Sequence, residues 1–227
     1  MDSNEASISV THANIGSYSK IQKFIYLFVK RIFDIFVSLM GMIFLIPIVL
    51  FVKIAYILTG DFHSIIYSHN RVGKNGKVFK MYKFRSMVYN ADEELKRLLK
   101  QKKYKDEWNK YQKLNDDPRI TKIGKVLRKT SLDETPQFIN ILLGHLSLIG
   151  PRPLIPGELD AHEGNHKIYE SVRPGITGWW AVNGRSATTY KKRLNLEYYY
   201  VKNMGFKLDF LCIIKTIKVV FNRTGAK

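Results

Sequence analysis

The 227-residue chain has one cysteine, Cys212, and only 19 acidic side chains against 37 lysines and arginines. A lone cysteine excludes an internal disulfide and fits a reducing compartment. The formal net charge of +18 indicates a polyanionic partner: nucleic acid, anionic lipid or a phosphorylated substrate. An apolar content of 45% is enough for a hydrophobic core, so the length predicts one folded domain.

Two further patterns are absent. Residues 1–19 are polar, without apolar periodicity or a basic start followed by an apolar core, so they predict a disordered tail and exclude a signal peptide. The later histidines have neither zinc-ligand spacing nor a serine or cysteine partner, and we interpret them as structural or surface residues. They are His63, His69, His145, His162 and His166.

Long uncharged stretches are limited to one, Ile35 to Val52, whose 18 residues reach the lower limit for crossing a bilayer. Pro47 lies inside it and predicts a broken helix. Lysines and arginines flank both sides, whereas a spanning helix normally has them on its cytoplasmic side. Residues 20–60 therefore predict a basic interfacial segment followed by a re-entrant membrane helix. A single-span anchor is the alternative, and we expect no further spans.

The chemistry-bearing stretch runs from Arg128 to Pro153. Ser131 and Glu134 have capping-box spacing, and a mostly apolar run follows and stops at Gly144. Asp133 and Glu134 should therefore lie in the first turn of a helix, although a proline at position 136 leaves the exact cap open. The helix dipole favours the charged form of both carboxylates, so we expect them to be ionised at neutral pH.

Adjacent helical residues point about 100° apart, so these two carboxylates are placed to divide roles rather than share a proton. One can attack an electrophile while the other holds a divalent cation. Arg128 precedes the pair, and Arg152 follows between two prolines; guanidinium groups bind phosphate bidentately. The set predicts phosphoryl transfer. The alternative is that Asp133 and Glu134 only cap a helix.

Elsewhere the pattern predicts a β-hairpin between residues 64 and 84, with Gly73 and Gly76 around a basic turn. Lys83 and Arg85, at its end, are candidates for contact with substrate phosphates, or else part of a solvated basic strand. A helix from residue 91 to Tyr111, a short helix over 123–127 and two membrane-surface helices over 190–203 and 208–221 follow.

Several of these stretches resemble the bacterial sugar transferases, the monotopic phosphoglycosyl transferases. The resemblance extends from about Lys30 to about Thr216 and rests on LRKTSLDETPQ and LIGPRPL (127–137 and 148–154), on KFRSM (83–87), on RPGITGWWAVNGR (173–185), and on a Lys-Arg-x-x-Asp start at residues 30–34. The chain departs from the family pattern at Ile46, where serine is common before the proline, at Ala181, where many relatives have glutamine, and at Glu197 and Gly205, where aspartate and serine are usual.

The resemblance implies a mainly helical α+β fold: a re-entrant helix and a compact cytoplasm-facing catalytic domain, residues 61–227, with a small β-hairpin and amphipathic surface helices. It implies an enzyme at the cytoplasmic face of the bacterial inner membrane that transfers sugar 1-phosphate from a UDP-sugar to undecaprenyl phosphate and releases UMP. The sugar and the oligomeric state stay open. The alternative is a non-enzymatic, membrane-tethered basic protein that binds nucleic acid or acidic polymer; the transferase needs no nucleic-acid partner.

The resemblance also assigns site residues. Asp133 would be the nucleophile, and Glu134 would hold Mg²⁺. Substrate phosphates would meet Arg128, Arg152, Lys83 and Arg85. Further substrate contacts would come from Arg173, Trp180 and Arg185, with Trp180 stacking on a base or sugar or else anchoring in the headgroup layer.

Overall fold

Helix α1, Lys20–Leu58, is the longest element of the structure, a computed structural model that describes residues 19–111, 114–184 and 188–221. Its start is a reciprocal capping box: the Ser19 hydroxyl accepts from the Gln22 N–H at 3.2 Å, and the Gln22 side chain accepts from the Ser19 N–H at 2.9 Å. It ends before Gly60, whose φ of +77° reverses the chain. The predicted tail before Ser19 lies outside the described residues.

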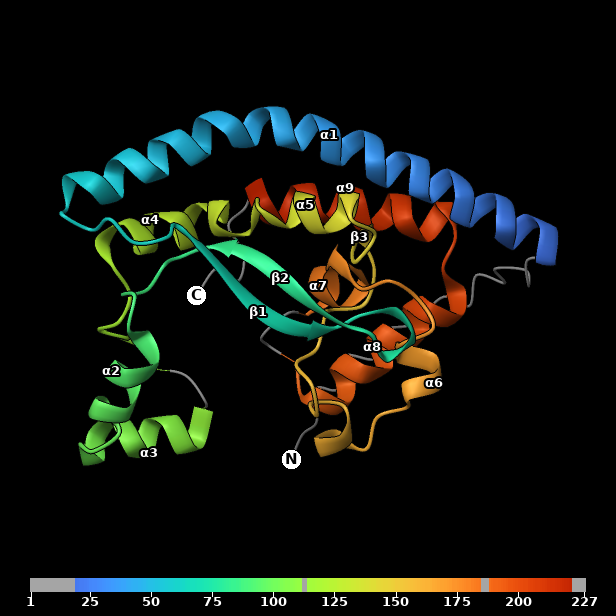
Figure 1. Ribbon diagram of the computed structural model, residues 1–227. Coiled ribbons are helices and arrows are strands. Elements are labelled where there is room, and N and C mark those ends of the chain that lie inside the picture. Colours follow the sequence, from blue (N-terminus) through green and yellow to red (C-terminus); the bar gives the residue numbers. More distant parts are fainter. Residues whose placement is uncertain (1–18, 112–113, 185–187, 222–227) are drawn as a thin grey trace.

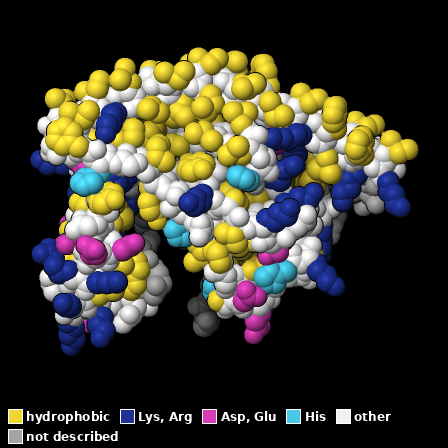
Figure 2. Space-filling model, in the orientation of Figure 1, with side chains coloured by type: hydrophobic (Ala, Val, Ile, Leu, Met, Phe, Trp, Pro, Cys, Tyr) yellow, Lys and Arg dark blue, Asp and Glu magenta, His cyan; other side chains and the backbone are white. Residues whose placement is uncertain are grey.

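Helix α1 lies along the domain rather than standing away from it (Figure 1). The Tyr26 hydroxyl near its start donates to Asp209 at 2.8 Å, and the Tyr56 hydroxyl near its end donates to the Arg85 carbonyl at 2.6 Å. Both ends are therefore held by the same domain. The opposite face is a continuous apolar surface (Figure 2), which includes Phe24, Phe28, Phe36, Ile43, Phe44, Ile46, Leu50, Phe51 and Leu58, each more than half exposed.

The predicted break at Pro47 is wrong, because α1 continues through the proline as one helix that curves smoothly over the domain (Figure 1). Pro47 lies on the exposed side and removes one backbone hydrogen bond there. Leu45 and Val52, on the inner side, are buried against the domain and keep both halves in line.

The Lys-Arg-x-x-Asp start anchors α1 to the loop region beneath it. Arg31 donates to the carbonyls of Ile141 and Leu142 at 2.7 and 3.0 Å, which end helix α5, Gln137–Leu142. Asp34 is buried and accepts from the Leu148 N–H at 2.9 Å. These contacts join residues more than 100 positions apart, so they set where α1 crosses α5.

Strands β1, Ile66–Val72, and β2, Val78–Phe84, form the predicted antiparallel hairpin. The turn between them contains the short helix η1, Lys74–Gly76, in which Asn75 and Gly76 both have positive φ. The hairpin is confirmed. Lys83 lies near the end of β2 and Arg85 just beyond it.

Several short helices, rather than one long one, connect the hairpin to the stretch that contains Asp133 and Glu134. The expected helix over 91–111 is two helices, α2 (Ala91–Leu98) and α3 (Lys102–Tyr111), which lie apart from α1 (Figure 1). Helix α4, Lys122–Thr130, is confirmed, with the Thr121 hydroxyl as its N-cap. The short helix η2, Leu132–Glu134, and α5 then follow.

The last part contains a feature that the sequence did not predict, a parallel pair of strands, β3 (Ser147–Ile149) and β4 (Gly175–Thr177). Each has three residues, too short to show a periodic pattern. The remaining elements are η3 (Asp160–His162), α6 (His166–Tyr169), α7 (Trp179–Asn183), α8 (Tyr190–Asn203) and α9 (Phe206–Phe221).

Helices α8 and α9 occupy the predicted positions but only α9 is a surface helix beside α1 (Figure 1). Helix α8 buries Leu194, Glu197 and Tyr200 in the interior of the domain, whereas its lysines, Lys191, Lys192 and Lys202, are exposed. The fold is thus mainly helical with a small hairpin, as the sequence predicts, and its core lies between α1, the hairpin and α8–α9.

Candidate active site

The carboxylate pair lies on η2, between the end of α4 and the start of α5. Ser131 has a left-handed backbone, φ 57°, which ends α4 and turns the chain into η2. The predicted capping box is wrong: neither η2 nor α5 has a side-chain cap, and α5 begins at Gln137 after Pro136. Ser131 is the residue between the two helices, but its side chain makes no cap hydrogen bond to η2, and Pro136 supplies a helical φ of −61° before α5.

Two basic residues lie beside the pair. The Lys83 ammonium, at the end of β2, donates to Glu134 at 2.6 Å. The Arg128 guanidinium, in the last turn of α4, donates through Nε to the Ser86 hydroxyl at 2.9 Å. Lys83 and Arg128 both favour the charged form of the half-buried Asp133 carboxyl. The structure therefore brings together Asp133, Glu134, Lys83 and Arg128 from three elements.

Burial raises the pKa of Asp133, and the neighbouring Glu134 carboxylate raises it further. The long helix whose dipole was expected to favour the charged form is absent at this point, because η2 is a single short turn. A carboxylate with a raised pKa is more basic, and a more basic oxygen is a stronger nucleophile. The environment of Asp133 is therefore suited to attack on an electrophile.

Arg85 is reassigned from substrate binding to structure. It is buried, and its guanidinium donates to the Ser64 carbonyl and to Asp61, each at 2.8 Å, while stacking over the Tyr56 ring at 4.4 Å. The prediction that Arg85 contacts substrate phosphates is wrong, because strand β2 ends at Phe84 and Arg85 turns inward. It joins the hairpin to the end of α1.

Arg152 lies in a second cluster, around Trp180. Its guanidinium is 5.7 Å from the Trp180 ring centre, and that of Arg193 is 4.8 Å away. Arg71 is close as well, since its guanidinium donates to the carbonyl of Pro153, the residue after Arg152, at 3.3 Å. Burial and the charge of Arg152 lower the pKa of Arg71. Within the described ranges no ion pair or hydrogen bond links Arg152 to Asp133, and the contact of Arg152 with a substrate phosphate stays a prediction.

The other predicted contacts are dispersed. The Trp180 indole N–H donates to the Thr188 hydroxyl at 2.9 Å, and arginines cover its ring, which makes it part of the domain rather than a headgroup anchor. Arg173 donates to the Gly144 carbonyl at 2.8 Å, beyond the far end of α5 from Asp133. Arg185 lies outside the described residues.

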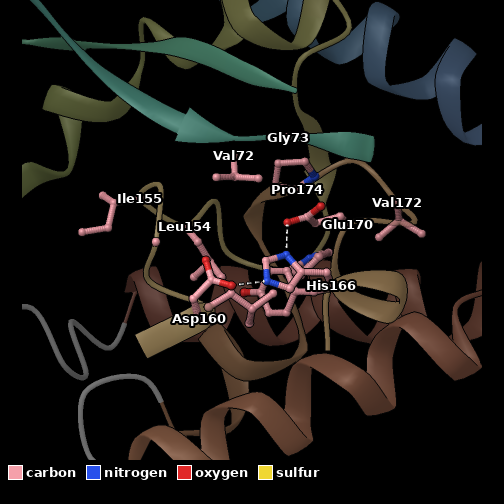
Figure 3. Close-up of a pocket in the computed structure, with 13 residues that line it drawn as sticks. Val72, Gly73, Leu154, Ile155, Asp160, His166, Glu170, Val172 and Pro174 are labelled. Atoms are coloured by element: carbon pink, nitrogen blue, oxygen red, sulfur yellow. Dashed lines mark hydrogen bonds and ion pairs between the residues drawn. The ribbon is translucent and has the colours of Figure 1, made fainter. Parts of the chain in front are cut away.

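An enclosed pocket beside α6 is separate from these residues (Figure 3). His166 lies between Asp160 and Glu170 and is 2.7 Å from each carboxylate. Hydrogen bonds to Glu170 and Asp160 raise the pKa of His166. The space is about 30 Å³, roughly that of one water molecule. This pocket is therefore too small for a sugar nucleotide.

A family model described as bacterial sugar transferase matches residues 25–223 of the chain. The chain belongs to the bacterial sugar transferase family. It is 45% identical over 200 residues to the undecaprenyl-phosphate galactose phosphotransferase of Salmonella typhimurium, which covers 88% of this chain and 42% of that protein. It is 40% identical over 198 residues to the exopolysaccharide production protein ExoY of Sinorhizobium fredii, which covers 87% of each.

A third relative is the UDP-N-acetylgalactosamine-undecaprenyl-phosphate N-acetylgalactosaminephosphotransferase of Aeromonas hydrophila, 34% identical over 209 residues, or 89% of this chain and 46% of that protein. The chain thus spans less than half the length of the Salmonella and Aeromonas proteins but most of ExoY. Each of the three matches covers most of this family member, so the matched stretch includes the residue range of both clusters described above.

The sequence did not identify three residues beside the predicted site residues of this family member. Ser86 orients Arg128, and Arg71 and Arg193 lie near Arg152. Arg193 was assigned to a membrane surface because basic and aromatic residues surround it. One signal was available: Arg193 and Glu197 are four residues apart in a predicted helix and so share a face.

A magnesium ion fits the carboxylate pair of this family member. In the described part of the chain no three histidine, cysteine or acidic side chains are grouped to hold a metal by themselves. Magnesium, however, is commonly held by one or two carboxylates together with substrate phosphates and water. Glu134 supplies one such carboxylate beside Asp133, so substrate phosphates and water would have to complete the coordination.

Glu197 makes the stability of the family member dependent on pH. Burial raises its pKa to about 7, against the usual 4.5, and its Oε1 accepts from the Arg152 N–H at 3.0 Å. The folded state therefore holds a proton that the unfolded state releases between about pH 4.5 and 7. As the pH rises through that window, the free energy of unfolding should therefore fall by about 3 kcal/mol.

The test is chemical denaturation of the detergent-solubilised chain at pH 5, 6.5 and 8, with Glu197→Gln beside the wild type. Glutamine keeps the acceptor for Arg152 but does not titrate, so the variant should lose this part of the pH dependence. If the free energy of unfolding changes with pH equally in both proteins, the titrating group is not Glu197.

Proposed function

We propose that the protein transfers sugar 1-phosphate from a UDP-sugar to undecaprenyl phosphate and releases UMP. The observation that carries the proposal is the half-buried Asp133 carboxyl, with Glu134 beside it and with Lys83 and Arg128 opposite. The names of the Salmonella and Aeromonas relatives support the same donor and acceptor classes. A binder of nucleic acid or acidic polymer would need the lysines but not this carboxylate pair.

In the proposed first step an Asp133 oxygen attacks the phosphorus that bears the sugar, and the bond from that phosphorus to the oxygen of UMP breaks. The leaving electron pair goes to UMP. Lys83 and Arg128 offset the repulsion between the carboxylate and the diphosphate. Magnesium, held by Glu134, would neutralise phosphate charge when bound.

In the second step an oxygen of undecaprenyl phosphate attacks the same phosphorus, and the bond to Asp133 breaks. The Asp133 carboxylate is regenerated, and the product is undecaprenyl diphosphate sugar. Arg71 and Arg152 form a second cationic cluster that can bind the nucleotide phosphate. Arg193 lies over the same Trp180 ring as Arg152 but is paired with Glu158 at 3.1 Å.

The function is tested with the full chain in lipid nanodiscs. UDP-sugars carrying radiolabelled sugar are supplied with undecaprenyl phosphate, and UMP release and label in the lipid extract are measured. Equal amounts of both should appear with at least one UDP-sugar, which also identifies the sugar. No transfer from any UDP-sugar, together with tight binding of nucleic acid, would favour the binding protein instead.

We further propose that both ends of α1 face the cytoplasm. The Tyr26 and Tyr56 contacts hold both ends against one domain, and the apolar surface of α1 faces away from it. Such a helix can enter one leaflet without crossing the bilayer.

Cysteines introduced by Lys20→Cys and Phe62→Cys, both at exposed positions, should therefore react with an impermeant reagent only after cells are opened. Asp61 is unsuitable because it pairs with Arg85. The parent chain is the background control, since Cys212 is buried. Labelling of either position in intact cells contradicts the proposed topology.

A further inference from the structure

A groove of about 360 Å³ lies beneath the N-terminal half of α1, bounded by β3, the 171–173 loop and the end of α8. Its volume is that of a small-molecule site. Five of its lining side chains are cationic and one, Asp34, is acidic; the cations are Lys23, Lys30, Arg31, Lys74 and Arg173. Figure 2 shows lysine and arginine side chains gathered directly below the apolar surface of α1 toward that end.

Some cations of the groove already have a partner within the protein, and others have no acidic partner among the described residues. Lys30 is paired with Asp209 at 2.5 Å, and Arg31 is bound to the carbonyls that end α5. Lys23 and Lys74 are exposed, and neither forms an ion pair with an acidic side chain of the described residues. The groove therefore has positive charge available for an anion.

The upper rim of the groove is apolar. Phe24, Leu27 and Phe28 line it, and their exposed fractions are 71%, 39% and 59%. They continue into the apolar surface of α1 described above. A ligand that matches both parts has an anionic head and hydrocarbon chains, and basic pockets beside membrane helices bind such lipid headgroups.

We propose that this groove binds the phosphate headgroup of an anionic phospholipid, which acts as a fixed membrane contact and is not consumed. Its chains would lie along Phe24 and Phe28, and its phosphate would lie between Lys23 and Lys74. Arg31 and Arg173, which also line the groove, both donate to carbonyls at the C-terminal end of α5. A lipid bound there would hold α1 and α5 together from the membrane side.

The acceptor lipid is a poorer match for this groove, an argument that rests on the proposed function. The phosphate of the acceptor must reach Asp133, which precedes α5, whereas the groove lies at the other end of that helix. Six helical residues span about 9 Å. None of Asp133, Glu134, Lys83 and Arg128 lines the groove. The lipid held there is therefore one that does not react.

The test uses the full chain in phosphatidylcholine nanodiscs that contain a photoreactive phosphatidylglycerol. Mass spectrometry after illumination should find modified residues within 23–34 or 171–174. The double variant Lys23→Gln/Lys74→Gln should bind the probe about tenfold more weakly, since each lysine at a membrane surface contributes to lipid affinity. Both side chains are exposed, so the variant should fold.

The matched control is Lys102→Gln/Lys105→Gln, which removes the same charge from exposed positions on α3, away from α1. It should bind the probe like the wild type. An equal loss in both double variants means general charge attraction and overturns the proposal. Displacement of the probe by equimolar undecaprenyl phosphate, but not by excess phosphatidylglycerol, assigns the groove to the acceptor and also overturns it. UMP release in the same nanodiscs tests the proposed function separately.

Discussion

Asp133→Asn should lower transfer by at least about 10³-fold, because it removes the proposed nucleophile while leaving the shape of the site intact. The effect should appear before any lipid is added. Wild-type protein with UDP-sugar alone should release at most one equivalent of UMP in a burst and gain the mass of a sugar phosphate. The variant should show neither the burst nor the added mass.

The rival mechanism is direct attack by undecaprenyl phosphate, with Asp133 only a metal ligand. In that case wild-type protein would form no adduct and release no UMP without lipid, yet turn over normally once lipid is supplied. That result would make the nucleophile assignment wrong. Asp106→Asn, an exposed carboxylate on α3, is the matched control and should behave as wild type.

Glu134→Gln should lower activity by about 10²-fold or more, and the activity that remains should need more magnesium. The substitution removes a hard oxygen ligand and also frees Lys83, which lies 2.6 Å from Glu134. These two effects separate in a magnesium titration. Loss of the metal ligand raises the magnesium concentration for half-maximal activity, whereas release of Lys83 alone does not.

A Lys83→Gln variant gives the comparison, since it breaks the same ion pair but keeps the carboxylate. It should lose activity without a changed magnesium requirement. Glu93→Gln, exposed at the start of α2, controls for the change of net charge. If Glu134→Gln responds to magnesium as the wild type does, the metal site is elsewhere.

Local pattern was sufficient where one segment decides its own structure. The predicted helix over 190–203 has the same bounds as α8, and the hairpin follows from β-rich runs around glycines. The motif also placed Asp133, Glu134 and Arg128 within one short stretch. Lys83 was expected in the site because the KFRSM stretch resembles a family motif. Its position in the sequence relative to Asp133 does not by itself predict that the two are close.

Arg85 and Lys83 show what the local sequence pattern does not predict. They are two residues apart, so a continuing strand would put both on one face. The strand ends at Phe84, and the partner that draws Arg85 inward is Asp61, 24 positions away in the sequence. Which of two similar basic residues lies in the site was decided by that distant partner.

The sequence by itself determined the family, the mainly helical composition, the long apolar helix and the motif that contains Asp133 and Glu134, because each depends on neighbouring residues. Only the tertiary structure decided that α1 runs unbroken across the domain, that Arg152 lies with Arg193 and Trp180, and that a basic groove opens beneath α1. The physical reason is common to all three. Each depends on contacts between segments distant in the chain, such as Arg31 with the end of α5, whose energies no local pattern records.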